Sequence, residues 1–393
     1  ETLLPNDRTI DIQPLWLGEY IYFLSDRNGG VANIWSYHTV TKALTQLTSF
    51  KGADVKWLSG NGKKLIYERE GWLHQIDLNG SNSKQLSVSV VGDFPWAAPR
   101  WENVGNRVAR AAISPTGKRA VMEARGEIFT VPVENGDVRN LTQSSNTADR
   151  APIWSPKGNE IAWFTDAGGK GYSLVIAPQD GMGKTRSIAI GESKMAWTPT
   201  WSPDGKYIAF VDDDLRIQVV ELATGAITTA DVGGINIERG GMGITWSPDA
   251  QWLAYAKTGT NMLRGIKAWN VKTKTILNLT DPFADAFSPA WDRDNKHLYF
   301  LASTDVALAS GWANTSSQNA RPEYEAYVIN LRKTDLSPFK PNSDEEEVKA
   351  EEKPKTDKPE EKPKTDAKPK EDKDVIIDIE HIDRRTIPLP LPK

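Results

Sequence analysis

The chain contains the run Trp201-Ser202-Pro203-Asp204-Gly205, and this run decides the fold because it recurs. Close copies are Trp154-Ser155-Pro156-Lys157-Gly158 and Trp246-Ser247-Pro248-Asp249-Ala250, and a decayed copy is Trp291-Asp292-Arg293-Asp294. The four tryptophans are 47, 45 and 45 residues apart. A period of about 40 to 50 residues is typical of the blades of a β-propeller.

Weaker copies extend this repeat towards the N-terminus. Ile113-Ser114-Pro115-Thr116-Gly117 precedes Trp154 by 41 residues, and two further copies begin at Trp57 and Trp16, also 41 residues apart. Each copy is followed by a short run of alternating apolar residues, then by a second such run after a polar turn. This pattern predicts antiparallel strands joined by hairpins.

The repeat itself is explained by turn chemistry. Proline fixes φ at one turn position, aspartate bonds its own backbone, and glycine accepts a positive φ. Tryptophan supplies a large apolar plate between neighbouring sheets. We therefore assign the repeat a structural role and not direct contact with a ligand.

The copies divide the chain into domains. The predicted blades lie near residues 14–50, 55–90, 108–145, 151–192, 198–232, 243–281 and 287–333. The spacing widens to 56 residues between Trp57 and Ile113, which predicts a boundary there. We expect two blades in residues 1–90, a linker in 91–106, and a second propeller in 107–393. A strand beginning at Val375-Ile376-Ile377-Asp378-Ile379 is expected to open a sixth blade of that propeller.

A charged tract follows the seventh predicted blade. Residues 344–374 hold 13 acidic residues, 9 lysines and 4 prolines, which accounts for the whole formal net charge of −4. We expect a disordered loop over 340–374. The rest of the chain is balanced, so it lacks the clustered positive charge that nucleic-acid binding requires, and we expect no nucleic-acid partner.

Other function classes lack the residues that they need. The chain has no cysteine, and therefore no disulfide, thiolate nucleophile or cysteine zinc site. It has no run of about 18 apolar residues that could cross a membrane as a helix.

No motif predicts a catalytic, cofactor-binding or metal-binding residue. Gly183-Lys184-Thr185 is not a phosphate loop, because Pro178 stands where the first glycine is needed, and it is expected to be a hairpin turn. Asp212-Asp213-Asp214 could bind a cation, but solvated acids are common at such a turn. The four histidines lie in separate segments, and no Gly-x-Ser-x-Gly nucleophile motif occurs.

Longer stretches resemble the tricorn protease homologues of bacteria. The resemblance begins with Ala111-Ala112-Ile113-Ser114-Pro115-Thr116-Gly117, Gly136-Asp137-Val138-Arg139-Asn140-Leu141-Thr142 and Trp154-Ser155-Pro156. It continues with Ala302-Ser303-Thr304-Asp305, Gly311-Trp312, Ser343-Asp344-Glu345-Glu346 and Ile382-Asp383-Arg384-Arg385. It covers essentially the whole chain, whereas the isolated repeat is shared with TolB-type propellers.

The resemblance implies an all-β fold of tandem β-propellers. Residues 1–90 would be the last two blades of a six-bladed propeller, and 107–393 an incomplete seven-bladed one with five blades and the start of a sixth. In that family a PDZ-like domain and a serine peptidase core follow, so the catalytic residues would lie downstream of Lys393. We expect the innermost strands to include the runs that begin near Gly126, Gly171, Leu215 and Ile266.

The implied function is that of a non-catalytic substrate or product channel in a serine peptidase that degrades oligopeptides. The implied partners are oligopeptides and further copies of the chain, and the implied location is the cytoplasm, with the periplasm as the alternative. Two other functions stay open: a TolB-like module that binds a protein partner, and a propeller with its own glycosidase or lactonase site.

Overall fold

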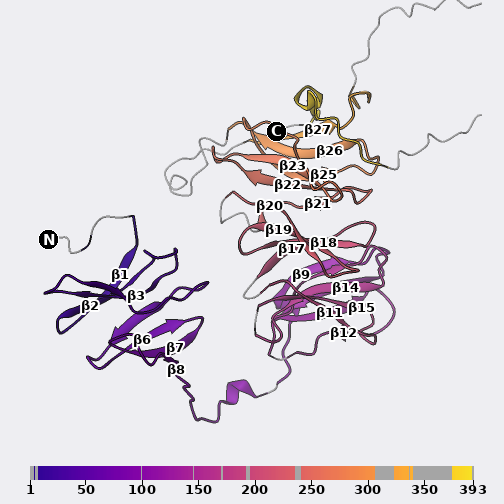
Figure 1. The fold of residues 1–393 in the computed structure, drawn as a ribbon. Coiled ribbons are helices and arrows are strands. Elements are labelled where there is room, and N and C mark those ends of the chain that lie inside the picture. Colours follow the sequence, from indigo (N-terminus) through magenta and orange to yellow (C-terminus); the bar gives the residue numbers. More distant parts are fainter. Residues whose placement is uncertain are drawn as a thin grey trace, which may run out of the picture. The chain divides into compact units, whose positions relative to one another are not determined.

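The fold is described by a computed structural model, which covers residues 4, 8–98, 100–144, 146–169, 171–191, 195–234, 240–305, 323–335, 337–339 and 374–391. Within these ranges it contains seven four-stranded antiparallel sheets and only short 3₁₀ helices (Figure 1). The prediction of an all-β chain is confirmed. The predicted loop over 340–374 lies outside the described residues except for Asp374.

The chain divides into two compact units, Glu1–Trp101 and Glu102–Lys393. The first unit holds two sheets. Their strands are β1 (Asp11–Leu17), β2 (Tyr20–Ser25), β3 (Asn33–His38) and β4 (Leu44–Gln46), then β5 (Lys56–Gly60), β6 (Lys64–Arg69), β7 (Trp72–Asp77) and β8 (Lys84–Gln85). The 3₁₀ helix η1 (Pro95–Ala97) follows them.

The second unit holds five sheets that follow one another along the chain. After η2 (Gly105–Arg107), the first three consist of β9 (Val108–Ile113), β10 (Arg119–Ala124), β11 (Glu127–Pro132) and β12 (Arg139–Asn140); β13 (Arg150–Trp154), β14 (Glu160–Thr165), β15 (Ser173–Pro178) and β16 (Arg186–Ala189); and β17 (Ala196–Trp201), β18 (Tyr207–Asp212), β19 (Arg216–Glu221) and β20 (Ile227–Val232). The last two consist of β21 (Thr245–Trp246), β22 (Trp252–Thr258), β23 (Arg264–Asn270) and β24 (Ile276–Asn278), and of β25 (Asp285–Trp291), β26 (His297–Ser303), β27 (Glu325–Asn330) and β28 (Thr386–Pro388).

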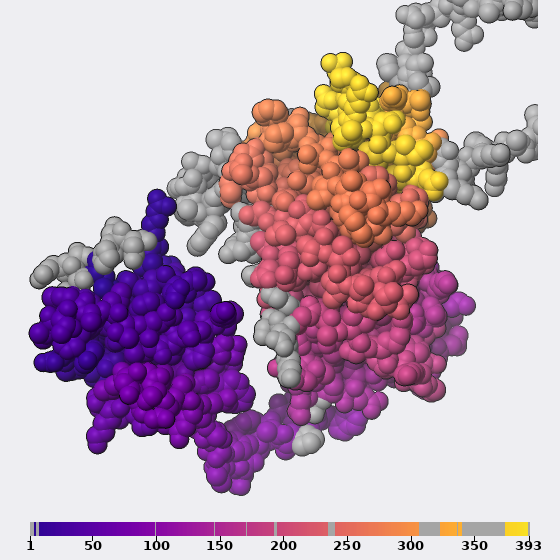
Figure 2. Space-filling model, viewed as in Figure 1, coloured from indigo at the N-terminus to yellow at the C-terminus, as the bar shows by residue number. Residues whose placement is uncertain are grey.

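The core of each unit lies between neighbouring sheets. Along β18, Ile208 and Phe210 pack into the cluster shared with the preceding sheet, whereas Ala209 and Val211 pack into the cluster shared with the next sheet. Side chains of a strand alternate between its two faces, so one apolar run serves two cores. Sheets that are consecutive in the sequence therefore pack against one another in the second unit, and its colours follow the order of the chain in Figure 2.

The repeated turns have the chemistry that the sequence predicts. In the Trp201 copy, Gly205 N–H donates to the Ser202 carbonyl at 2.9 Å and Tyr207 N–H donates to Ser202 Oγ at 2.9 Å. Ser202 Oγ donates in turn to Asp204 Oδ1 at 2.7 Å, and Gly205 has a φ of +77°. Corresponding serine bonds occur in the copies at Ser114, Ser155 and Ser247.

Two details of the sequence prediction are wrong. On β1, Trp16 pairs with Ile21 of β2. Leu65 of β6 corresponds to Ile21, and its partner on β5 is Gly60, so the residue equivalent to Trp16 is Gly60 and not Trp57, which lies three residues earlier. Trp57 instead lies in the bulge of β5 with a φ of +53°, the place that Gln13 occupies in β1, so a tryptophan at a different position of the sheet was mistaken for the repeat.

The segment 375–379 contains no strand and opens no sixth blade. Val375 is buried against the preceding sheet, where its N–H donates to Asp249 Oδ2 at 2.8 Å and its carbonyl accepts from Trp252 Nε1 at 3.3 Å. The strand that follows is β28, which pairs with β27 and completes the fifth sheet. Val375 is therefore a core residue, Ile377 packs against the same cluster, and Ile376 and Ile379 are exposed.

Candidate functional site

The first strand of every sheet lies at the inner edge, where the sheets converge. In the second unit, β9, β13, β17, β21 and β25 contact one another in succession, and β1 contacts β5 in the first unit. Each first strand pairs with the second strand of its own sheet on one side only. The expectation that the runs near Gly126, Gly171, Leu215 and Ile266 are innermost is wrong, because these runs form third strands.

Most of these inner strands are interrupted by a β-bulge with an unusual backbone. The register of β13 with β14 shifts between Arg150 and Ile153, and Ala151 within this shift has a φ of +53°. Thr198 and Ser288 occupy the same place in β17 and β25, with φ of +48° and +54°. A proline follows each of the three. Proline offers no N–H, and a bulge breaks the regular edge, so these strands are poor templates for an added strand.

Tryptophans of the repeat connect the inner strands of neighbouring sheets. Trp154 Nε1 donates to the Ala112 carbonyl at 3.1 Å, Trp246 Nε1 to the Thr200 carbonyl at 3.2 Å, and Trp291 Nε1 to the Thr245 carbonyl at 3.2 Å. In each case the acceptor precedes the repeat position of the preceding sheet. The tryptophan is therefore a hydrogen-bond donor as well as the predicted apolar plate.

Trp201 breaks this rule. Its indole Nε1 is buried and has no hydrogen-bond partner among the described residues. The acceptor expected by analogy is the Ile153 carbonyl on β13. The junction between the sheets of β13 and β17 therefore lacks the indole hydrogen bond that the other three junctions of the unit have.

A pocket of about 290 Å³ opens on the inner strands beside this junction. Its lining is Arg110, Ala111 and Ala112 of β9, Ala151, Pro152 and Ile153 of β13, and Pro199 of β17. Arg110 is its one charged lining residue, and no described residue forms a hydrogen bond or ion pair with the Arg110 side chain. The pocket combines an apolar wall of small residues with a single available guanidinium.

Asp212-Asp213-Asp214, a candidate cation site from the sequence, contacts a cation of the chain itself, Arg216. Arg216 Nε donates to Asp212 Oδ2 at 2.7 Å, and Arg216 Nη2 lies 3.1 Å from Asp214 Oδ2. Burial lowers the pKa of Arg216, but its bonds to these carboxylates outweigh burial and raise it. Asp212 and Asp214 thus form ion pairs with Arg216.

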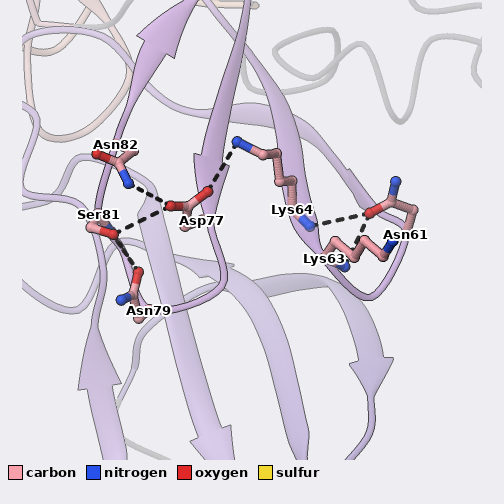
Figure 3. A network of polar contacts seen from close by, with 7 residues as sticks. All are labelled: Asn61, Lys63, Lys64, Asp77, Asn79, Ser81 and Asn82. Carbon is pink, nitrogen blue, oxygen red and sulfur yellow. Dashed lines mark hydrogen bonds and ion pairs between the residues drawn. The ribbon is translucent and has the colours of Figure 1, made fainter.

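A second polar cluster, in the first unit, has the same explanation (Figure 3). The Asp77 carboxylate accepts from Asn82 Nδ2 at 2.6 Å and lies 3.1 Å from Lys64 Nζ, so it is paired with an ammonium of the chain. The bonds from Asn82 and Lys64 hold the pKa of the Asp77 carboxyl below its usual range. This cluster joins two neighbouring hairpin turns.

A third cluster was not anticipated from the sequence. Ligand atoms of Asp292, Asp294 and His297 lie within 4.8 Å of one another in the decayed copy of the repeat. His297 Nδ1 contacts Asp294 Oδ2, and Asp292 Oδ2 accepts from Tyr299 at 3.1 Å. The cluster could have been predicted from the repeat itself, because Asp292 stands where the other copies have serine. Turn N–H groups already bind both carboxylates.

Gly183-Lys184-Thr185 lies in the connection between β15 and β16, which pair antiparallel, so the hairpin prediction is confirmed. In the described part of the chain, no helix has the length and hydrophobicity needed to span a bilayer.

Comparison with known proteins relates this architecture to one family. Residues 108–393 match the model of the tricorn protease second β-propeller domain, and residues 1–82 match that of the tricorn protease N-terminal β-propeller domain. Tricorn protease homolog 1 of Streptomyces coelicolor is 29% identical over 352 residues, which are 84% of this chain and 31% of the relative. The tricorn protease homolog of Saccharolobus solfataricus is 25% identical over 290 residues, which are 74% and 26%.

A solved structure agrees at the level of the fold. The crystal structure of the tricorn protease superposes with a TM-score of 0.50 at 17% identity, covering 97% of this chain and 34% of the other. The chain thus spans about a third or less of the length of these relatives. Because one propeller model matches well over half of the residues, the chain belongs to the tricorn protease family, of which it represents β-propeller regions.

Proposed function

We propose that the chain is the propeller part of a longer serine peptidase that degrades oligopeptides, and that its inner strands line a passage for peptides. The observation that carries this proposal is the convergence of first strands whose free edges bear bulges and prolines. Such edges form a wall along which an extended chain moves without being captured as an additional strand.

A narrow passage selects substrates by their conformational cost. A folded protein would have to unfold before it entered, which costs about 5 to 15 kcal/mol for a typical domain. A short flexible peptide has to give up mainly its own conformational entropy. The passage therefore favours oligopeptides over folded proteins.

In this proposal, residues 1–90 are the last two blades of a first propeller, 91–106 a linker, and 107–393 part of a second propeller. The five four-stranded sheets of the second unit would be five blades of that propeller. We place the catalytic residues, and a PDZ-like domain, outside this chain, and we assign no catalytic, cofactor or metal residue within it. We further propose a homo-oligomer in the cytoplasm.

The peptidase assignment is tested with the product of the complete reading frame and with this chain alone. The complete product should cleave fluorogenic oligopeptides and lose this activity on treatment with a serine-reactive fluorophosphonate, whereas the chain alone should cleave none. Turnover by the chain alone, or no turnover by the complete product, would contradict the proposal and favour a TolB-like interaction module.

The passage is tested by blocking its wall. The chain contains no cysteine, so Ala111→Cys on β9 offers one labelling position in a background cleared of other accessible cysteines. A bulky maleimide there should slow peptide cleavage by the complete product. The matched control is Ser187→Cys on β16, the fourth strand of its sheet, which is also exposed. Equal effects of the two labels would argue against a passage along the inner strands.

A further inference from the structure

We propose that the inner-strand pocket at Arg110 binds an acidic side chain of an extended peptide, so that the passage favours acidic over neutral or basic peptides. This inference rests on the proposed function, because it assigns a substrate preference to the same wall. Beyond that function, it assigns substrate recognition to Arg110 and specifies that the recognised side chain is negatively charged.

Arg110 is available to a ligand. Arg110 is exposed on β9, and its cross-strand neighbour is Glu123 on β10. Glu123 is only 9% exposed, and its Oε2 accepts the Ala151 N–H at 2.8 Å, so this carboxylate connects two sheets and does not pair with Arg110. The guanidinium thus faces the pocket without a counterion from the described residues.

The other nearby carboxylates are already bound within the chain. Asp149, immediately before β13, accepts from Trp163 Nε1 at 3.1 Å and from Thr147 Oγ1 at 3.2 Å. On β25, Asp285 accepts two bonds from the Arg264 guanidinium. Among the described inner strands of the second unit, no carboxylate is left to neutralise Arg110, and the wall there carries positive charge.

The shape and chemistry of the pocket also suit an acidic side chain. Ala111, Ala112 and Ala151 keep the wall shallow, and Pro152 and Pro199 present apolar rings without N–H donors. The methylenes of a glutamate fit such a wall while its carboxylate reaches the guanidinium, which forms paired hydrogen bonds with carboxylates. A lysine or arginine of the peptide would meet a like charge, which is unfavourable in a partly dry site.

An acidic side chain suits this place better than a carboxyl terminus. In an extended chain, side chains on one face recur about every 7 Å, so a pocket in the wall meets them repeatedly as the chain passes. A chain has one carboxyl terminus, and only at its end. A wall that selects along the length of a peptide must therefore recognise side chains.

The test uses this chain and peptides that are acetylated and amidated, so that no terminal charge remains. Two fluorescent heptapeptides carry Glu or Gln at the centre and are otherwise identical, and a third carries the Gln centre with a free carboxyl terminus. Binding is followed by anisotropy at low ionic strength. A partly exposed ion pair contributes roughly 1 kcal/mol, so the Glu peptide should bind about threefold to tenfold more tightly than the capped Gln peptide.

The variant Arg110→Gln should abolish this preference. The matched control is Arg107→Gln, an exposed arginine three residues earlier that does not line the pocket, and it should retain the preference. Equal affinity for Glu and Gln peptides, a preference that survives Arg110→Gln, or equal loss in Arg107→Gln would overturn the proposal. So would tighter binding of the Gln peptide with the free terminus than of the capped Glu peptide. Each of these results leaves the cleavage assay of the complete product unaffected, so failure here is distinct from failure of the proposed function.

Discussion

The two tryptophans Trp291 and Trp201 should respond differently to the same substitution. Both are half-buried and occupy the same position of the repeat. Trp291 Nε1 donates to the Thr245 carbonyl at 3.2 Å, whereas Trp201 Nε1 is buried without a partner. Phenylalanine removes the N–H in both cases and leaves most of the apolar ring in place.

The magnitudes follow from this one difference. The packing loss on Trp→Phe is on the order of 1 to 2 kcal/mol at either position. At Trp291 the lost hydrogen bond adds about 1 kcal/mol, and more if the Thr245 carbonyl is left unpaired. At Trp201 the variant instead removes an unpartnered buried donor, which returns about 1 to 3 kcal/mol. Trp291→Phe should therefore lower the free energy of unfolding by at least about 2 kcal/mol more than Trp201→Phe.

Urea unfolding followed by far-ultraviolet circular dichroism measures this difference without relying on the indole fluorescence that the substitutions remove. The slopes with denaturant should agree between variants, so that the midpoints report stability. Trp154→Phe and Trp246→Phe should behave as Trp291→Phe does. Equal losses at Trp201 and Trp291 would refute the reasoning, since they would mean that the Trp201 indole has a hydrogen-bond partner in solution.

Three further changes test the polar and turn contacts. Gly205→Ala should lower the free energy of unfolding by about 1 kcal/mol, because Gly205 has a φ of +77°, which is unfavourable for alanine. A Cβ there meets no atom within 4 Å, so backbone strain is the only expected cost. An unchanged urea midpoint would contradict a left-handed conformation at this turn. Burial raises the pKa of Asp231, but bonds from Lys257 and Tyr255 outweigh burial and lower it. The ionised carboxylate therefore stabilises the fold above about pH 4, and this stabilisation disappears as the pH falls below that value. Asp231→Asn should flatten the dependence of Tm on pH in this range, and parallel profiles of Tm against pH for the two proteins would contradict this contribution. Arg216→Met leaves Asp212, whose side chain is 3% exposed, without its cation and should cost about 2 kcal/mol or more in a urea titration, whereas an unchanged midpoint would show that the pair is dispensable.

The repeat predicted most of the fold because turn chemistry is local. Serine, proline, aspartate and glycine act within five residues, and the structure contains the predicted turn in the copies that carry them. The decayed copy at Trp291 still begins a strand connection at the expected place, because Asp292 and Asp294 bind the turn N–H groups.

The order of the strands from inside to outside could not be predicted by the same route. Second and third strands such as β18 and β19 are both buried on two faces, so their apolar runs look alike. Three inner strands are instead marked by the dipeptides Ala151-Pro152, Thr198-Pro199 and Ser288-Pro289. The first residue of each dipeptide has a positive φ, which marks the bulge but cannot be inferred from the sequence. The last strand, β28, has only three residues and pairs with β27 from beyond the charged tract, so no local pattern marks it.

The contacts of individual side chains were predicted least well, because they depend on pairs that are distant in sequence or in different sheets. The acidic triplet suggested a cation, and the structure provides it from Arg216 on the next strand. Arg110 gave no signal in the sequence, since its availability depends on Glu123 being bound to Ala151 in another sheet.

In the proposed passage, the inner edge has to meet two requirements that would conflict in an ordinary sheet. A strand edge that faces a passage would capture any extended peptide through its free N–H and carbonyl groups. Bulges with Ala151, Thr198 and Ser288 at positive φ, each followed by proline, weaken that capture at three of the inner strands. Recognition is then left to side chains, and the available guanidinium in the pocket is that of Arg110. A wall of this kind can discriminate by charge and still release the peptide, because an exposed ion pair of roughly 1 kcal/mol is too weak to retain it.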